Sequence, residues 1–298
     1  MPEFKFGFEE SWFRLTIKKL PTHPRLFCKD KESVANAQTL LRIGSLKVGA
    51  AGVWAQAANI IYKKKNGEYE LTPFGKLIAI LDPDLEEDGI WWAIHYNLAR
   101  YKSDAWFYAF YINLFEQKTS ERASLETEIR NYWDKDHKKP MTDSTFDKLI
   151  FPPFKQVFDG TRLGHTFGLF KPLEENKFAR VLNDNHRVPH AILCYALTDW
   201  SQKDQRQSAH ISKLLEPWGP GRIFGLNRET LDNMLIEIAD RYQKKVAWIS
   251  HTANLNSVSI LNVSPLVMLS TFYHEMDGKE PLDAFEAAIS PKSDEGSL

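Results

Sequence analysis

The sequence predicts a mainly α-helical α+β protein: an N-terminal winged helix-turn-helix, an aromatic-rich helical middle and an α+β C-terminal domain. Three observations support this class. Two helical patterns and a hairpin signal come first, aromatic residues at helical spacing follow, and the second half mixes apolar helices with short strands and glycine turns. With 298 residues, 43 % of them hydrophobic, the chain has ample material for a buried core.

The expected domain organisation follows from these patterns. The N-terminal arm and winged helix-turn-helix take residues 1–81, the helical aromatic-rich region takes 82–138, the C-terminal α+β domain takes 139–290, and 291–298 form a disordered tail. The boundary near residue 138 is predicted from a charged stretch that contains Pro140 and no large aliphatic side chain apart from Met141.

The stretch after the arm has the element order of a winged helix-turn-helix. An amphipathic helix over 33–43, which Ser33 can cap by accepting a backbone N–H, precedes a second helix over 48–62. Asn66-Gly67 then predicts a β-hairpin, because both central residues of a type I′ turn need positive φ. We expect this turn to form the tip of the wing, and a short helix to end the domain.

Basic residues gather in this N-terminal part. From Trp12 to Lys76 there are twelve Lys and Arg against four acidic residues, a net charge of +8, which leaves −9 for the rest of a chain whose formal net charge is −1. This asymmetry favours a polyanion footprint over an ordinary solvated face. The predicted DNA contacts are phosphate contacts by Lys47, Lys63, Lys64, Lys65 and Lys76, and base contacts by Gln56 and Asn59.

The second predicted helix offers few side chains for reading bases. Gly49, Ala50, Ala51 and Gly52 are all small, and each glycine costs about 1 kcal/mol relative to alanine in a helix interior. Small residues permit close approach either of a phosphate backbone or of a neighbouring helix, and the sequence leaves both possibilities open. Backbone contacts are therefore expected to dominate DNA binding.

Downstream, the apolar spacing predicts a largely helical chain. Helices are expected over 89–101, 104–115, 120–133, 188–200, 228–239 and 264–273, a hairpin over 158–170, and strands near 224 and over 244–249. The aromatic residues of the first two helices are too many for one face. They indicate buried core rather than a platform for stacking bases.

The run from 82 to 88 is a candidate metal site, with ligands Asp82, Asp84, Glu86 and Asp88. Hard cations prefer oxygen ligands and phosphodiester chemistry often uses them, so Mg²⁺ or Mn²⁺ is the predicted cofactor. Asp84 and Asp88 are the predicted catalytic carboxylates, with His95 further along the next helix as a base. The alternative is that these acids only stabilise the N-terminus of that helix through its dipole. A polar turn at His251 and Asn254 is the reserve candidate.

Several function classes have no signature in the sequence. P-loop, GxGxxG, GxSxG, HExxH and CxxC motifs are absent, so ATPase, dehydrogenase, common hydrolase and zinc-site readings lack support. Cys28 and Cys194 are too few for a disulfide framework, and a cytoplasmic protein is expected. The N-terminus lacks the apolar core of a signal peptide. The sequence also contains no run of about 18 apolar residues, so no membrane-spanning helix is predicted.

Several stretches, in chain order, resemble SspB-type proteins, a family long catalogued as a domain of unknown function. In the first half these are FEES at 8–11, LTPFG at 71–75, DPDLEED at 82–88 and WWAIHY at 91–96. In the second half they are YALTDW at 195–200, PWGPGRIF at 217–224 and HTANL at 251–255. The resemblance covers nearly the whole chain and is more specific in the first half.

The resemblance implies a role in bacterial DNA phosphorothioation, an antiphage defence in which sulfur replaces a non-bridging phosphate oxygen. It implies a protein that nicks one DNA strand so that sulfur can be inserted. The implied partners are a cysteine desulfurase, an ATPase and a sulfurtransferase related to PAPS reductases. The alternative is a non-enzymatic winged-helix protein, either a regulator or an adaptor that recruits the modification enzymes.

Overall fold

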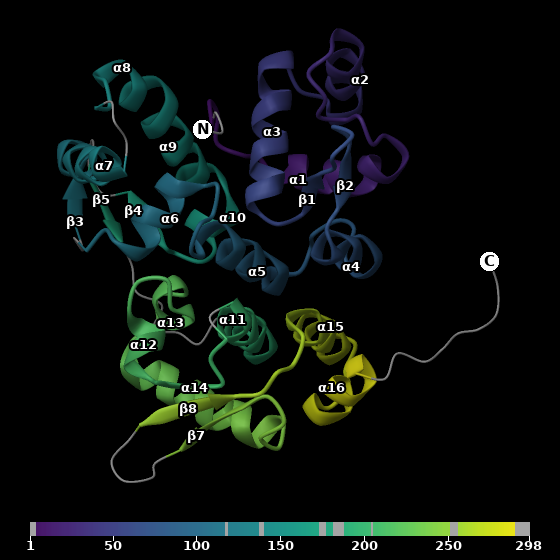
Figure 1. Cartoon of the computed structure of the whole chain (residues 1–298), viewed down its shortest axis with the longest axis vertical. Coiled ribbons are helices and arrows are strands. Elements are labelled where there is room, and N and C mark those ends of the chain that lie inside the picture. The colour runs from purple at the N-terminus through teal and green to yellow at the C-terminus, as the bar shows by residue number, and fades with distance from the viewer. Residues whose placement is uncertain are drawn as a thin grey trace. The chain divides into compact units, whose positions relative to one another are not determined.

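A computed structural model of the chain describes residues 4–116, 119–136, 140–172, 177–180, 188–203, 205–250 and 256–289. The chain divides into two compact units, Met1–Asn183 and Asp184–Leu298. Helices predominate and the strands form small antiparallel sheets (Figure 1), which confirms the predicted mainly helical α+β class. Within the described ranges, no helix combines the length and the apolar character that crossing a bilayer requires. The predicted tail, 291–298, lies outside the described residues.

The first unit opens with a helix and a short 3-10 turn, after which two helices, a hairpin and a further helix follow in the expected order. Its elements are α1 (Glu10–Lys19), η1 (Leu20–Thr22), α2 (Lys31–Leu41), α3 (Ser45–Ala57), β1 (Ile61–Lys63), β2 (Tyr69–Leu71) and α4 (Pro73–Leu81). β1 and β2 pair antiparallel, with Ile61 opposite Leu71. The predicted hairpin is confirmed, but the type I′ turn at Asn66-Gly67 is wrong. Gly67 has a positive φ of 89° and Asn66 does not, and the Gly67 N–H donates to the Lys64 carbonyl at 3.0 Å, so Lys65 and Asn66 are the central residues of the turn.

The two helices before the hairpin start earlier than predicted. α2 begins at Lys31 because Asp30, and not Ser33, is its N-cap: the Asp30 carboxylate accepts a hydrogen bond from the Ser33 backbone N–H at 3.0 Å. This hydrogen bond is the main reason that the pKa of Asp30 is lowered to about 2. α3 begins at Ser45, directly after the extended residue Gly44.

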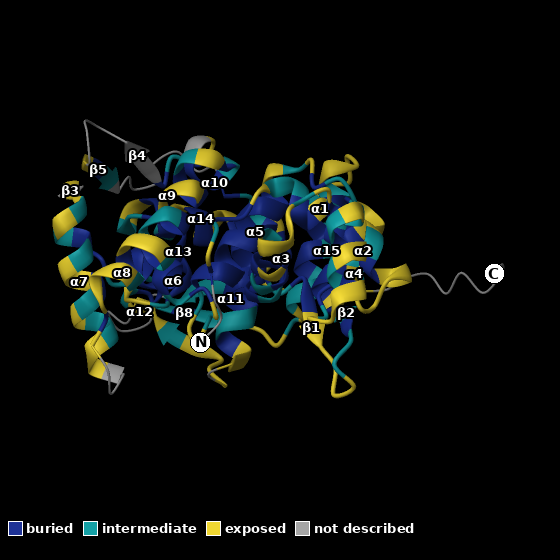
Figure 2. Cartoon of the chain, turned by 90° about the horizontal axis from the view of Figure 1, so that it is seen from above, coloured by how far each residue is buried: buried dark blue, intermediate teal, exposed yellow. Residues whose placement is uncertain are grey.

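α5 (Asp88–Ala99) and α6 (Trp106–Asn113) form the aromatic centre of the first unit. Every residue of α5 after the first is buried, and the helix lies in the dark blue region of Figure 2. Trp91 stacks on Phe8 with ring centroids 6.4 Å apart, and Trp54 packs edge-on against Phe107 at 5.8 Å. The prediction that these aromatic residues form core is confirmed.

The first unit continues with short helices and a three-stranded antiparallel sheet of order β3-β5-β4. Its further elements are β3 (Thr119–Glu121), α7 (Arg122–Asp136), α8 (Asp143–Thr145), the π-helical turn η2 (Phe146–Ile150), α9 (Phe151–Gly160), α10 (Arg162–His165), β4 (Phe170–Pro172) and β5 (Lys177–Arg180).

The first compact unit extends past residue 138, where the sequence composition suggested a boundary. The aromatic face of α9 packs on α6: Phe154 lies 4.9 Å from Tyr111, and Phe158 lies 5.3 Å from Tyr108, between ring centroids. These contacts join the segment after the charged stretch to the aromatic centre. The compact units therefore divide after Asn183 instead.

The hairpin predicted over 158–170 is wrong. Phe158 belongs to α9, and the residues after it form α10. Gly164 approaches α9 so closely that a Cβ would lie 1.6 Å from the Phe158 carbonyl oxygen. This glycine serves helix packing rather than a turn between strands.

The second unit combines helices with a three-stranded antiparallel sheet of order β6-β8-β7. Its elements are α11 (His190–Lys203), β6 (Ser208–His210), α12 (Ser212–Leu215), α13 (Pro220–Ile223), α14 (Arg228–Arg241), β7 (Ala247–Ser250), β8 (Ser257–Ile260), α15 (Pro265–Met276) and α16 (Pro281–Ile289). The buried helix predicted over 188–200 is confirmed as α11. The strand predicted near 224 is wrong, because Pro220 starts the helical turn α13 after the extended Gly219.

Candidate nucleic-acid interface

The N-terminal arm is fixed on α3 by aromatic residues. The Trp54 indole N–H donates a hydrogen bond to the Phe6 carbonyl oxygen at 2.7 Å. Phe4 and Phe8 pack against the same indole, with ring centroids at 4.6 and 5.1 Å. Since side chains alternate along an extended segment, burying Phe4 leaves Lys5 exposed beside the helix.

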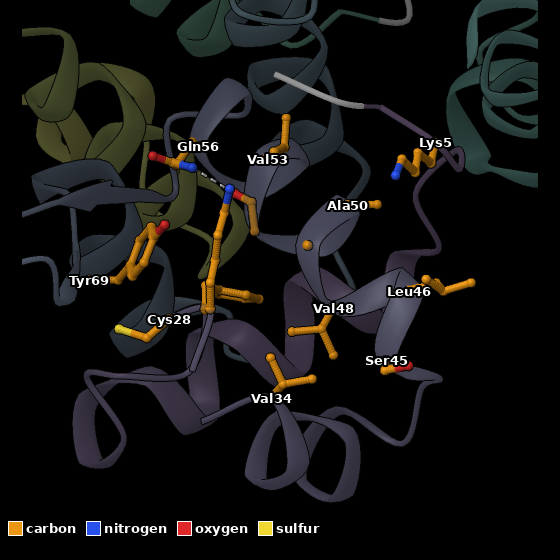
Figure 3. A pocket seen from close by; sticks show the side chains of 14 residues that line it. Lys5, Cys28, Val34, Ser45, Leu46, Val48, Ala50, Val53, Gln56 and Tyr69 are labelled. Atoms are coloured by element: carbon orange, nitrogen blue, oxygen red, sulfur yellow. Dashed lines mark hydrogen bonds between the residues drawn. The ribbon is translucent and has the colours of Figure 1, made fainter. Parts of the chain in front are cut away.

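A hollow of about 430 Å³, which we call the α3 groove, opens between the arm, the segment before α2, α3 and β2. Figure 3 shows Lys5 and Tyr69 on opposite sides of it. Its lining residues are Lys5, Phe27, Cys28, Lys29, Val34, Ser45, Leu46, Val48, Gly49, Ala50, Gly52, Val53, Gln56 and Tyr69.

The two glycines of α3 have different roles. A Cβ on Gly52 would lie 2.9 Å from the Phe27 ring, so this glycine allows the segment before α2 to pack on the helix. A Cβ on Gly49 would meet no atom within 4 Å. Gly49 therefore presents helix backbone to open space in the groove, where a ligand can approach closely.

The α3 groove is basic. Lys5 and Lys29 line it, and among its described lining residues none is acidic. In two neighbouring hollows of the same unit, lysines are accompanied by Glu9 and Asp159 or by Glu70. The groove thus offers an anion two lysine side chains together with exposed backbone.

Carboxylates already engage three of the five lysines predicted to contact phosphate. Lys47 Nζ lies 2.7 Å from Glu9 Oε1. Lys76 Nζ lies 2.6 Å from Glu70 Oε1, and Lys64 Nζ lies 3.7 Å from Glu70 Oε2. The hydrogen bond from Lys76 is the largest cause that lowers the pKa of Glu70, so Glu70 stays charged at neutral pH and competes with any phosphate.

The other two predicted lysines, Lys63 and Lys65, lie in the hairpin and are exposed. Lys63 Nζ stands 5.8 Å from the centroid of the Tyr69 ring. Because Tyr69 also lines the α3 groove, Lys63 extends the positive charge of the groove toward the turn.

Gln56 and Asn59, the two residues predicted to contact bases, lie in different surroundings. Gln56 lines the groove, but its side-chain amide donates a hydrogen bond to the Gly52 carbonyl at 3.3 Å. Asn59 has a φ of 61°, and its carbonyl oxygen accepts a hydrogen bond from the Thr72 hydroxyl. Asn59 turns the chain from α3 into β1, so its backbone has a structural role that the sequence did not indicate.

Lys5 and Lys29 also line the groove, although neither was predicted from the sequence to contact DNA. The alternation Phe4-Lys5-Phe6 indicated an extended arm, which is the signal that could have found Lys5. That the arm lies on α3 depends on Trp54, some fifty residues along the chain, and no local pattern shows this pairing.

The carboxylates of the acidic run point to different partners. Asp82 accepts hydrogen bonds from the backbone N–H groups of Glu86 and Glu87, at 2.9 and 3.2 Å. Asp84 pairs with Lys18 of α1. Within the part of the chain that the structure describes, no three His, Cys, Asp or Glu side chains are grouped so as to hold a metal ion. In this arrangement Asp82, Asp84, Glu86 and Asp88 do not fit a metal site.

Arg162 of α10 ties the end of the acidic run to α1. Its Nη1 donates to the Glu86 carbonyl oxygen at 2.9 Å and lies 3.2 Å from Asp88 Oδ1. Its backbone N–H donates to Glu10 at 2.7 Å, and its guanidinium stands 5.6 Å from the Trp91 ring. These contacts give the run a structural role, in addition to the helix-dipole role considered from the sequence.

His95 does not join the carboxylates. It is fully buried in α5, and its Nδ1 lies 2.6 Å from the Tyr108 hydroxyl oxygen. In this position it cannot reach a phosphodiester, because the aromatic centre encloses it. The reserve candidates His251 and Asn254 lie outside the described residues.

We expect removal of the competing carboxylate to strengthen DNA binding. Glu70→Gln should raise the affinity for random-sequence duplex DNA about two- to fivefold, the size of an exposed ion pair, because Lys76 and Lys64 become available. Fluorescence anisotropy at fixed salt measures this. Glu32→Gln, the same charge change on α2, is the control; equal gains in both variants would contradict the competition.

Comparison with known proteins identifies a family and a fold. A family model described as "Protein of unknown function (DUF4007)" matches residues 5–151 and 165–273. A "Magnesium ion-bound SspB crystal structure" aligns with a TM-score of 0.78 and 16 % identity over 96 % of this chain and 95 % of that chain. An "SspB crystal structure" aligns with a TM-score of 0.73 and 18 % identity over 97 % and 86 %. No curated protein matches significantly. The expected resemblance to SspB-type proteins is confirmed, and it extends to the fold.

Proposed function

The chain belongs to the DUF4007 family, and from that membership and its SspB-like fold we propose that it is the DNA-binding component of a bacterial DNA phosphorothioation system. The phosphorothioation role comes from the resemblance to SspB-type proteins. A cysteine desulfurase, an ATPase and a sulfurtransferase related to PAPS reductases then supply the sulfur and the energy, since the chain carries no motif for either chemistry.

The single observation that carries DNA binding is the basic α3 groove, with Lys5 and Lys29 and no acidic residue among its described lining side chains. A phosphate backbone is the ligand that matches such a groove, because positive charge and exposed helix backbone both favour anions. Gly49 gives the ligand access to the helix surface.

The elements around the groove support a winged helix-turn-helix, with α3 as the recognition helix and the hairpin β1–β2 as the wing. In this proposal α3 faces the duplex with its N-terminal part, where Ser45, Leu46 and Gly49 are exposed, and the wing lysines contact the flanking phosphates. Contacts to the phosphate backbone then determine the binding affinity of this module, which is nearly independent of the DNA sequence.

The wing lysines provide the test of this footprint. Changing Lys63, Lys64 and Lys65 together to Gln should weaken binding to all duplex sequences alike. The dependence of log K on log salt should flatten by up to about one unit per lost contact. Lys135, Lys148 and Lys177, which are exposed and lie outside the module, changed together to Gln are the matched control. Random-sequence affinity unaltered in the wing variant at every salt concentration would place the footprint elsewhere.

We further propose that the protein nicks one strand of the DNA that it binds. The test is to incubate supercoiled plasmid with the purified protein, with and without magnesium, and to measure the conversion to nicked circles. One similar structure is described as magnesium ion-bound, which motivates the magnesium arm. If the acidic run takes part, Asp84→Asn with Asp88→Asn loses nicking while DNA affinity is kept. Full nicking in the double variant would remove these carboxylates from the mechanism.

A second candidate function is a non-enzymatic adaptor that holds DNA for the modification enzymes. It is favoured by one specific observation. Asp84 and Asp88 are engaged in ion pairs, Asp82 accepts backbone N–H groups of the loop before α5, and His95 is buried. The same plasmid assay distinguishes the two. DNA that is bound but never nicked, with and without magnesium, supports the adaptor.

A further inference from the structure

On the α3 helix itself, the groove offers few side chains for base recognition. Gly49 and Ala50 are small, and the Gln56 amide is engaged with the Gly52 carbonyl. Phosphate contacts carry no sequence information directly, so any selectivity for particular DNA sequences requires contacts to base edges. The second unit contains a cluster of amide and guanidinium side chains that have no role in the DNA contact proposed above.

This cluster lies between α11 and β6, where backbone hydrogen bonds fold the chain back on itself. The Arg206 N–H donates to the Ser201 carbonyl at 2.9 Å, and the Ser201 hydroxyl donates to the Arg206 carbonyl. The Gln202 amide donates to Asn262 Oδ1 at 3.1 Å and to the Val263 carbonyl at 2.9 Å. The described part of this segment is thus anchored at both ends before any ligand arrives.

Beside this segment is a hollow of about 260 Å³ lined by polar side chains, among them Gln205, Arg206, Gln207 and Asn262. Gln205, Arg206 and Gln207 are exposed. The Arg206 guanidinium stands 5.4 Å from the Trp200 ring centroid, which orients it. No acidic residue is among the described lining residues.

We propose that Gln205, Arg206 and Gln207 form a second DNA contact, in which these side chains read base edges. The inference rests on the proposed DNA-binding function and adds the specificity that α3 lacks. The chemistry is that of major-groove recognition: a glutamine amide can pair bidentately with adenine, and an arginine guanidinium with guanine. Gln207 is well placed for this role, because its carbonyl accepts the Ile260 N–H at 2.9 Å and holds its backbone at the sheet edge.

The test uses the full-length protein and a library of random-sequence duplex DNA. Bound DNA is recovered and sequenced, and affinities are then measured for the selected sequence and for unselected library. We expect the parent to enrich a motif. The variant Gln205→Ala with Gln207→Ala should lower the ratio of selected to random affinity by about tenfold or more, the size of lost bidentate base contacts.

Gln243→Ala is the matched control. Gln243 is an exposed glutamine of the same unit, and its φ of 47° resembles the 51° of Gln205, so backbone strain is equal. An unchanged ratio in the double variant, or a parent that retains DNA but enriches no motif, overturns this inference alone. A parent that retains no DNA at all overturns the proposed function, so the two failures are distinguishable.

Discussion

Reversing the two groove lysines, Lys5→Glu with Lys29→Glu, is expected to weaken binding of random-sequence duplex DNA by about a hundredfold or more. The change replaces the positive charge of the α3 groove with negative charge, so that it removes attraction and adds repulsion at the same place. Fluorescence anisotropy at low and at moderate salt measures the loss, which should be larger at low salt because screening weakens both effects.

The control for this variant is Lys135→Glu with Lys148→Glu, which changes the net charge equally on exposed residues away from the groove. Tryptophan fluorescence reports whether the arm still packs on Trp54, since Lys5 is flanked by Phe4 and Phe6. Equal losses in both double variants would mean that only net charge matters. Undiminished binding in the groove variant would remove the α3 groove from the interface.

Replacing His95 by alanine is expected to lower the free energy of unfolding by about 2–4 kcal/mol. The change leaves a cavity in the aromatic centre and takes away the partner of the Tyr108 hydroxyl, which is itself fully buried. Burial keeps that phenol neutral by raising its pKa well above the ordinary value. Denaturant unfolding followed by tryptophan fluorescence measures the change.

His95→Gln separates packing from catalysis, because glutamine can keep a hydrogen bond to Tyr108 and fills more of the space than alanine does. We expect it to be less destabilising than His95→Ala. If the parent nicks plasmid DNA, both variants should nick it under conditions where they are folded. A variant that is as stable as the parent but does not nick DNA would indicate that His95 is catalytic, contrary to its buried position beside Tyr108.

The sequence by itself determined the features that depend on neighbouring residues. The hairpin between β1 and β2 was predicted from the glycine-containing turn alone, although the turn is centred on Lys65 and Asn66 and of the two predicted turn residues it is Gly67 that has a positive φ. The aromatic density of residues 89–115 was enough to predict core, because so many rings cannot be hidden on one helix face. The candidate lysines of the hairpin were likewise visible as a local cluster of charge.

The tertiary structure alone decided which charges are available. Asp84 pairs with Lys18, 66 residues away, and Asp88 with Arg162, 74 residues away. Lys5 gains its place beside α3 through Trp54. Because the acidic run and His95 are neighbours in sequence, they were predicted to form one site. In the structure Asp84 and Asp88 pair with cations of other helices, whereas His95 contacts the buried Tyr108. The partners that hold Asp84 and Asp88 come from distant parts of the chain, and only the fold brings them together.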